Sequence, residues 1–397
     1  MNIIPNIINK RNSITMRKLA TLFVFLSVIS LCVFSEEEPQ NHPIHIAVPS
    51  LTISPEARGA GMGDVGAATT ADVSSQFWNP AKYVFIESNA GMSFSFTPWL
   101  RKLVEDINLS YLVGYWKFNE KRALSASLRY FSLGEIVMYD WSGNDWGSAY
   151  PNELAADVAY SQRLFENFSA AVALRFIYSD LNNGKNMSGG TEVYPGIAVG
   201  ADVAMYYRLP IQVYSGDANW ALGFNLSNIG SKITYDKSAS SSFIPTNLRL
   251  GTSFEYPIDE YQRISINADA YKYLVPTVDY LKTADNRDYY NDMTALQGMI
   301  SSFYDAPGGF KEEMQEITWS VGAEYAYNNQ FFVRAGYFNE HAYKGNRKFF
   351  TAGAGFKLNV FQLDASYVVS IAQTNPLDQT LRFSLSFDLY GLKNLIR

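Results

Sequence analysis

Histidine is scarce in this chain, and that scarcity limits the acid–base and metal chemistry the sequence can support. The three histidines are His42, His45 and His341, and the last stands beside Glu340. None has the spacing of a zinc site, and none can be combined with serine and aspartate into a catalytic triad. We therefore expect no enzyme active site, no metal and no cofactor, although an acid/base pair without histidine stays open.

Three glycines form the only nucleotide-binding pattern that we identify. Gly61, Gly63 and Gly66 match G-x-G-x-x-G, which binds dinucleotides only where it joins a parallel strand to a helix. No such unit surrounds it. We expect these glycines to let the chain turn tightly against a neighbouring wall of structure.

The charge balance argues against a nucleic-acid partner. The chain has 32 Lys and Arg against 38 Asp and Glu, a formal net charge of -6. Such a chain has no basic field with which to attract phosphate backbones.

The N-terminus has the pattern of a signal peptide. An apolar run, Leu19–Phe34, follows four basic residues and is followed at once by acidic ones. We expect a signal peptide over 1–35, cleaved after Ser35, and a linker over 36–48. Leu31 is too bulky for lipid modification of Cys32, so the exported chain would contain no cysteine.

From Gly91 onward the chain repeats one unit, an alternation of apolar and polar residues followed by turn residues. This pattern predicts strands with one apolar face. We expect an all-β membrane protein, an antiparallel transmembrane β-barrel of about 14 strands over 89–391, with a periplasmic tail over 392–397. The expected strands are 91–97, 107–118, 123–131, 154–164, 168–179, 197–208, 220–228, 248–256, 264–274, 317–327, 331–339, 349–358, 361–370 and 381–389.

The alternation also predicts which charges point into the lumen. In the last strand Phe383 and Leu385 alternate with Arg382 and Ser384, so a shift of one residue would put charge into lipid. Mixed charges in a filled lumen are expected to pair, although rings of charge in a conducting pore are the alternative. The expected inward charges are Arg129, Asp157, Arg175, Asp202, Asp269, Glu324, Arg334, Lys357, Asp364, Arg382 and Asp388.

Connection lengths predict the orientation. Short connections alternate with long ones, as in outer-membrane barrels with short periplasmic turns and long extracellular loops; only 209–219 is longer than a periplasmic turn should be. We therefore expect the bacterial outer membrane, with both termini periplasmic or luminal.

The segment before the barrel, 49–88, is rich in small residues and is expected to form a luminal hatch, because a barrel of this circumference needs filling. The residues expected to matter in it are Gly61, Gly63, Gly66, Trp78, Asn79 and Pro80.

The loop insertion 275–316 changes from strand to helical periodicity. Met293, Leu296, Ile300 and Phe303 would share one helix face, with Asp288 or Asn291 as cap and Pro307-Gly308-Gly309 ending the run. This face is either a lid packed on the barrel mouth or an anchor for a partner or cargo protein. The loop 97–106, with Trp99, Leu100 and Leu103, is the second expected contact.

Three runs of sequence resemble the PorV family of the type IX secretion system of Bacteroidota. They are LTISPEARGAGMGDVGAATTADVSSQFWNPAKY from Leu51, SFTPWLRKLVEDINLSYL from Ser95 and SLRYFSLGEI from Ser127. The run Trp78-Asn79-Pro80-Ala81 is also similar to the hatch of the wider FadL-type superfamily, whose barrels have fourteen strands.

The resemblance implies a non-enzymatic role in protein export. Members of the PorV family dock on the lateral opening of the SprA/Sov-type translocon barrel and receive cargo by the cargo's C-terminal signal domain. They shuttle the cargo to the sortase complex, which attaches it to lipopolysaccharide of the outer membrane. The alternative is a FadL-type channel for hydrophobic small molecules, which requires a continuous apolar tunnel. A lipopolysaccharide deacylase is the weakest reading, because no strand is expected to place a histidine in the lumen.

Overall fold

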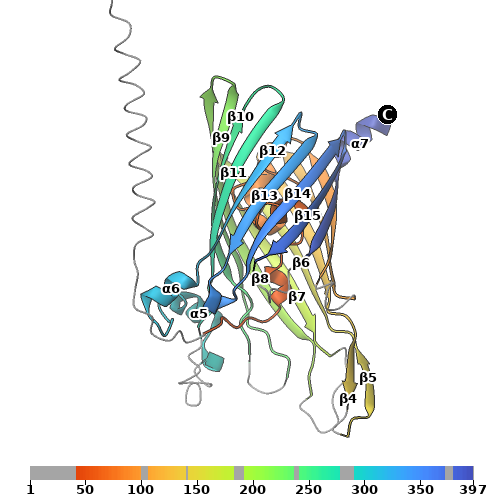
Figure 1. Ribbon diagram of the computed structural model, residues 1–397, viewed down its shortest axis with the longest axis vertical. Helices are drawn as coiled ribbons and strands as arrows, with labels where there is room; N and C mark the ends of the chain where they lie inside the picture. Colours follow the sequence, from red (N-terminus) through yellow and green to blue (C-terminus); the bar gives the residue numbers. More distant parts are fainter. Residues whose placement is uncertain are drawn as a thin grey trace, which may run out of the picture. The chain divides into compact units, whose positions relative to one another are not determined.

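The protein is a closed antiparallel β-barrel of fourteen strands (Figure 1). The computed structural model describes residues 42–99, 106–139, 142–182, 192–236, 241–277, 290–371 and 379–396. Each strand pairs with its neighbour in the sequence, and β1 closes the ring by pairing with β16. The barrel strands are β1 (Ala90–Pro98), β2 (Asn108–Asn119), β3 (Arg122–Ser132), β6 (Asn152–Phe165), β7 (Phe168–Asp180), β8 (Gly196–Val213), β9 (Gly216–Gly230), β10 (Asn247–Pro257), β11 (Gln262–Tyr273), β12 (Thr318–Tyr327), β13 (Phe331–Asn339), β14 (Lys348–Leu358), β15 (Phe361–Ser370) and β16 (Leu381–Asp388).

The predicted alternation and strand count are confirmed. In β16 the polar residues Arg382 and Ser384 are buried, whereas Phe383 and Leu385 are 44% and 39% exposed on the outer face. An apolar outer face and a polar inner face are what a barrel in lipid requires. Turns of two to four residues join the strands at one end, here called the short-turn end, and all longer connections lie at the other, the long-loop end.

One predicted long turn is wrong. The connection expected over 209–219 is mostly strand, because Pro210 continues β8 opposite Asn219 and leaves only Tyr214 and Ser215 as the turn. Pro210 interrupts the sequence pattern, since proline has no N–H for a sheet. All short turns are therefore at the same end of the barrel.

A small hairpin within the third connection was missed. Strands β4 (Ile136–Tyr139) and β5 (Asp145–Ala149) form a separate two-stranded sheet, which projects beyond the barrel at the long-loop end (Figure 1). Four or five residues are too few to establish an alternating pattern in the sequence.

The remaining described elements are short helices. Helices α5 (Ala295–Ser301) and α6 (Phe310–Gln315) lie in the connection between β11 and β12, η3 (Ala342–Lys344) joins β13 to β14, and α7 (Leu389–Ile396) follows the last strand at the short-turn end. Among the described residues, no helix has the length and apolar character needed to cross a membrane.

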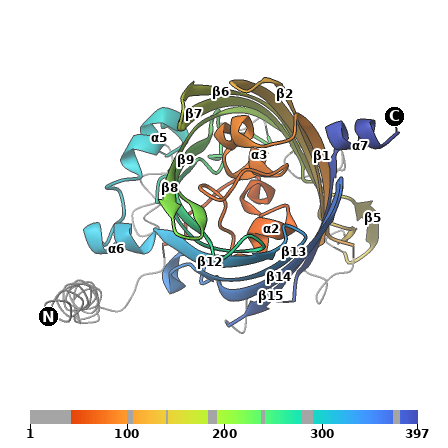
Figure 2. The same cartoon turned by 90° about the horizontal axis from the view of Figure 1, so that it is seen from above.

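Residues 42–89 are here called the luminal segment, because most of it lies inside the ring of strands (Figure 2). The segment contains η1 (Pro49–Thr52), α2 (Ala57–Ala60), α3 (Ser75–Trp78) and η2 (Pro80–Phe85). It starts at the long-loop end, where the Ala47 N–H donates to the Phe243 carbonyl, and reaches the short-turn end, where Lys117 binds the Ile86 carbonyl. His42, the first described residue, thus lies at the opposite end of the barrel from α7.

Candidate functional site

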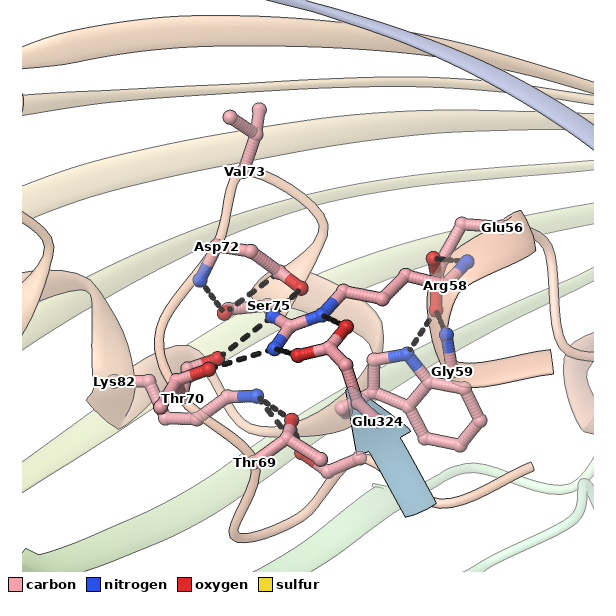
Figure 3. Close-up of polar contacts among 12 residues, drawn as sticks. Glu56, Arg58, Gly59, Thr69, Thr70, Asp72, Val73, Ser75, Lys82 and Glu324 are labelled. Carbon is pink, nitrogen blue, oxygen red and sulfur yellow. Dashed lines mark hydrogen bonds and ion pairs between the residues drawn. The ribbon is translucent and has the colours of Figure 1, made fainter. Parts of the chain in front are cut away.

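Arg58 fastens the luminal segment to the barrel wall (Figure 3). It projects from α2, whose N-cap Glu56 accepts from the N–H groups of Arg58 and Gly59. The Arg58 guanidinium binds Glu324 of β12 at 2.9 and 3.1 Å and Asp72 at 2.7 Å. Two further bonds go to the carbonyl and hydroxyl of Thr70. Every arm of the guanidinium is therefore occupied, which is the condition for a buried charge to be tolerated.

The ion pairs continue along the inner wall. Glu324 also binds Arg334 at 2.6 Å, and Arg334 binds Asp364 at 2.7 Å. On the other side of the barrel, Arg175 pairs with Asp157 and Asp202, each at 2.9 Å. The described lumen thus contains paired charges rather than an apolar path.

Nine of the eleven predicted inward charges are buried; Lys357 and Asp388 are the exceptions. Lys357 is exposed because it lies at the end of β14, at the short-turn rim, where the inward side of the strand no longer lines the lumen. Asp388 is half-buried at the same rim, where it accepts from Ser88 and from the first N–H groups of α7.

The predicted glycines lie where the luminal segment approaches other backbone. Gly63 has φ +77°, and an added Cβ would lie 2.8 Å from the backbone of Tyr337. Gly61 caps α2 against Gly353, and Gly66 lies under the Trp78 ring while its N–H donates to Asp269. A side chain at Gly63 would meet both strain and overlap.

The run Trp78-Asn79-Pro80 connects the segment to several strands. Trp78 is buried and its indole N–H donates to Glu56 at 2.8 Å. The Asn79 side chain caps η2 and donates to the carbonyls of Ala67 and Met205, and the Pro80 carbonyl accepts from Ser161. These residues therefore hold the segment in place and leave no polar group free for a ligand.

The connection between β11 and β12 is fastened to the barrel rim by its acidic side chains. Glu312 and Glu316 bind Lys344 of η3 at 2.6 and 2.9 Å, and Glu313 binds Lys272 of β11 at 2.9 Å. All five side chains are buried. Burial acts to raise the pKa of the Glu312 carboxyl, but hydrogen bonds from Lys344 and Gly308 outweigh it and hold that pKa below its usual range.

Several apolar side chains of the same connection are exposed. Leu296, Ile300 and Phe303 are 63%, 55% and 53% exposed. Met293 is different and corrects the prediction of one four-residue face, because α5 begins after it and it is buried. Thr294, not Asp288 or Asn291, caps the helix, through a capping box with Gln297. Asp288 lies outside the described residues. Three more exposed apolar residues, Tyr304, Phe310 and Met314, lie in the same connection.

The second expected contact loop is described only at its start. Trp99 is half-buried against a cluster inside the barrel that includes Tyr271 and Phe338. Leu100 and Leu103 lie outside the described residues.

No pattern in the sequence identifies Arg58, Lys272 or Lys344 as anchors. Arg58 precedes the predicted hatch glycines, but its partner Glu324 is 266 residues away. Periodicity locates strand residues and says nothing about which loop or luminal residue meets them.

Fold and site together define a membrane β-barrel whose lumen is filled by its own ion-paired N-terminal segment and whose long-loop end carries an exposed apolar surface. The family model of the type IX secretion system protein PorV matches residues 36–280, more than half of the chain. The chain belongs to the PorV family and is an outer-membrane component of that secretion system. A comparison with curated proteins found no match.

Solved structures with a similar fold include hydrocarbon channels and transporters. A TodX deltaS2S3 mutant monoaromatic hydrocarbon channel has a TM-score of 0.50 at 10% identity, covering 83% of this chain and 96% of that one. The Pseudomonas putida toluene transporter TodX has a TM-score of 0.49 at 9% identity, covering 88% of this chain and 98% of that one. A Pseudomonas aeruginosa FadL homologue has a TM-score of 0.41 at 10% identity, covering 84% of this chain and 98% of that one. At these identities the likeness concerns the fold alone.

Proposed function

We propose that this protein is a non-enzymatic carrier of the type IX secretion system that docks on the lateral opening of the translocon, receives the C-terminal signal domains of cargo, and delivers them to the surface attachment complex. The single observation that supports docking is the reversed polarity of the α5–α6 connection. Its acidic side chains bind the rim, while the apolar side chains of Leu296, Ile300 and Phe303 are exposed.

A lid that only covered the barrel mouth would bury its apolar side chains and expose its acidic ones. An amphipathic helix normally buries its apolar face and exposes its charges. Here the buried acids Glu312, Glu313 and Glu316 already hold the connection in place, so the exposed Leu296, Ile300 and Phe303 add nothing to that attachment. A contiguous exposed apolar surface of this kind is typical of a protein interaction site.

The channel alternative lacks comparable support. A hydrophobic molecule would need an apolar route through the lumen, yet the described lumen contains Arg58, Glu324, Arg334 and Asp364 joined by ion pairs. Moving an apolar molecule past these groups would require breaking buried pairs, which costs about 3–5 kcal/mol each.

The proposal is tested by the triple variant Leu296→Asp, Ile300→Asp, Phe303→Asp. We expect the barrel to fold, judged by its heat-modifiable migration on gels, while co-purification of the translocon or of cargo falls at least tenfold. The matched control is Val137→Asp with Tyr139→Asp on the exposed β4 strand, which should leave co-purification unchanged. Undiminished co-purification and cargo display in the triple variant would overturn the docking role.

A further inference from the structure

Helix α7 leaves the barrel wall at the short-turn end and points outward. Both ribbon views show it outside the ring of strands, beside β1 (Figures 1 and 2). Its eight residues, Leu389–Ile396, span about 12 Å, far less than the roughly 30 Å of a bilayer's hydrocarbon core. A helix of this length that projects from a lipid-facing wall must lie either in the surface layer of the bilayer or in the water beyond it.

The first turn of α7 is fixed by contacts with the barrel rim. The Asp388 carboxylate accepts from the N–H groups of Tyr390 and Gly391, at 3.0 and 2.9 Å, and from the Ser88 hydroxyl. A Cβ added at Gly391 would lie 2.8 Å from a methyl group of Val360, so the helix backbone rests directly on the turn between β14 and β15. The barrel therefore sets the direction in which α7 leaves the wall.

Exposed aromatic side chains mark the level of the membrane surface at this end. They stand at or near the short-turn ends of their strands: Phe118, Phe165, Tyr327, Phe331, Phe356 and Phe361. In membrane barrels such rings gather at the level of the lipid headgroups. Phe361 packs against Phe387 of β16 with 5.4 Å between ring centroids, and α7 begins two residues after Phe387. The helix therefore starts at the headgroup level.

The apolar side of α7 continues the lipid-facing row of β16. Phe383 and Leu385 are exposed on the outer face of that strand. Leu389, the first residue of the helix, follows them in the same alternation and is 39% exposed. The helix thus begins with an apolar residue on the side of the wall that already contacts lipid.

The sequence of α7 is amphipathic over its whole length. At 3.6 residues per turn, half of its positions fall within about 120° of arc and are all apolar; these are Leu389, Leu392, Leu395 and Ile396. The other side is polar, with a hydroxyl, an ammonium and an amide among its residues, which are Tyr390, Lys393 and Asn394. Helices with this pattern lie in the plane of a bilayer, between the acyl chains and the headgroups.

We propose that α7 binds the phospholipid surface of the leaflet at the short-turn end, with its apolar positions toward the acyl chains and the position of Lys393 on the headgroup side. The phosphates of that layer suit a cationic residue. A water-soluble protein is the alternative occupant, but the bilayer already contacts the wall from which α7 projects. The inference is independent of the proposed docking role, which concerns the long-loop end.

The test is electron paramagnetic resonance on the purified protein in vesicles of phosphatidylethanolamine and phosphatidylglycerol. Single spin labels are attached through Leu392→Cys, Ile396→Cys or Asn394→Cys, each in a Cys32→Ser background. Collisions of the label with oxygen, which concentrates in lipid, are compared with collisions with a water-soluble nickel chelate. We expect the oxygen-to-nickel ratio to be about fivefold higher at 392 and 396 than at 394, because only the apolar side enters the acyl region.

Two reference positions give the lipid and water limits of this ratio. Leu385→Cys lies on the lipid-facing wall, and Tyr214→Cys lies in an exposed turn at the same end. Ratios near the water limit at both 392 and 394 would place the helix in water. Few collisions with either reagent at 392 and 396 would show that protein covers the apolar side. Either result overturns the inference.

A further variant tests whether the apolar side itself holds the helix at the membrane. In a chain labelled at 396, Leu392→Asp combined with Leu395→Asp should raise the nickel accessibility close to that of the label at 214. Asn394→Asp is the matched control and should leave the accessibility unchanged, and heat-modifiable migration checks that each barrel is folded. A label that stays shielded in the double variant would show that the barrel alone positions the helix, which would overturn the binding role.

Discussion

Replacing Arg58 with methionine removes the charge that joins the luminal segment to the wall while keeping much of the side-chain volume. In this variant Asp72 loses the cation with which it pairs, and Glu324 keeps Arg334 as its ion-pair partner. Removing one partner of a buried, hydrogen-bonded ion pair costs about 3–5 kcal/mol. At about 1.4 kcal/mol for each factor of ten, the smaller value corresponds to a roughly hundredfold increase in local opening of the segment.

Hydrogen exchange measured by mass spectrometry resolves this effect, because local opening and global unfolding expose different amides. Protection of residues 56–76 should fall about a hundredfold in Arg58→Met, while strands β6 to β9 keep theirs and the barrel remains heat-modifiable. The control is Arg263→Met, which loses a half-exposed pair of 3.7 Å with Glu255 and should cost at most about 1 kcal/mol. If exchange in 56–76 changes less than threefold in a folded Arg58 variant, the ion pairs do not hold the segment.

Three further outcomes are expected. Gly336→Ala would place a Cβ 2.1 Å from the backbone of the luminal segment. It should therefore destabilise that segment by about 1–3 kcal/mol, measured by hydrogen exchange. Gly114→Ala, whose Cβ would have its nearest atom at 3.4 Å, is the control and should be neutral. Burial raises the pKa of Asp305 to about 6; the folded α5–α6 connection is therefore favoured below that pH and loses stability as the pH rises through it. Asp305→Asn should abolish the difference between pH 5 and pH 8 in the hydrogen-exchange protection of the α5–α6 connection, after correction for intrinsic rates. A persisting difference would assign the pH dependence to another group. His45→Cys, exposed at the long-loop end, should react with a membrane-impermeant maleimide on intact cells. Tyr214→Cys, exposed at the short-turn end, should react only after permeabilisation. The reverse result would show that the barrel has the opposite orientation in the membrane.

Strands were predictable because each residue of a barrel wall faces either lipid or lumen, so the alternation repeats across the whole chain. Direct cross-strand pairs such as Asp157 with Arg175 and Glu324 with Arg334 follow from that register. Where one residue breaks the rule, as Pro210 does, the predicted strand ended too early.

The luminal and loop contacts were not predictable in the same way. Arg58 meets Glu324, and Glu316 meets Lys344, because the closed barrel brings distant segments together. Met293 fits a helical spacing equally well whether it begins the helix or precedes it. Thr294 is the cap, so Met293 lies outside the helix, where it is buried.

The course of the luminal segment through the barrel constrains how the molecule is assembled. Its last residues are continuous with β1, which forms the closing seam with β16, and its first described residue lies at the opposite mouth. To leave through the short-turn end, the segment would have to draw its leading residues through the full length of the lumen past every ion pair. The strands must therefore close around a segment that is already in place, and the β1–β16 seam is expected to be the last part of the wall to form.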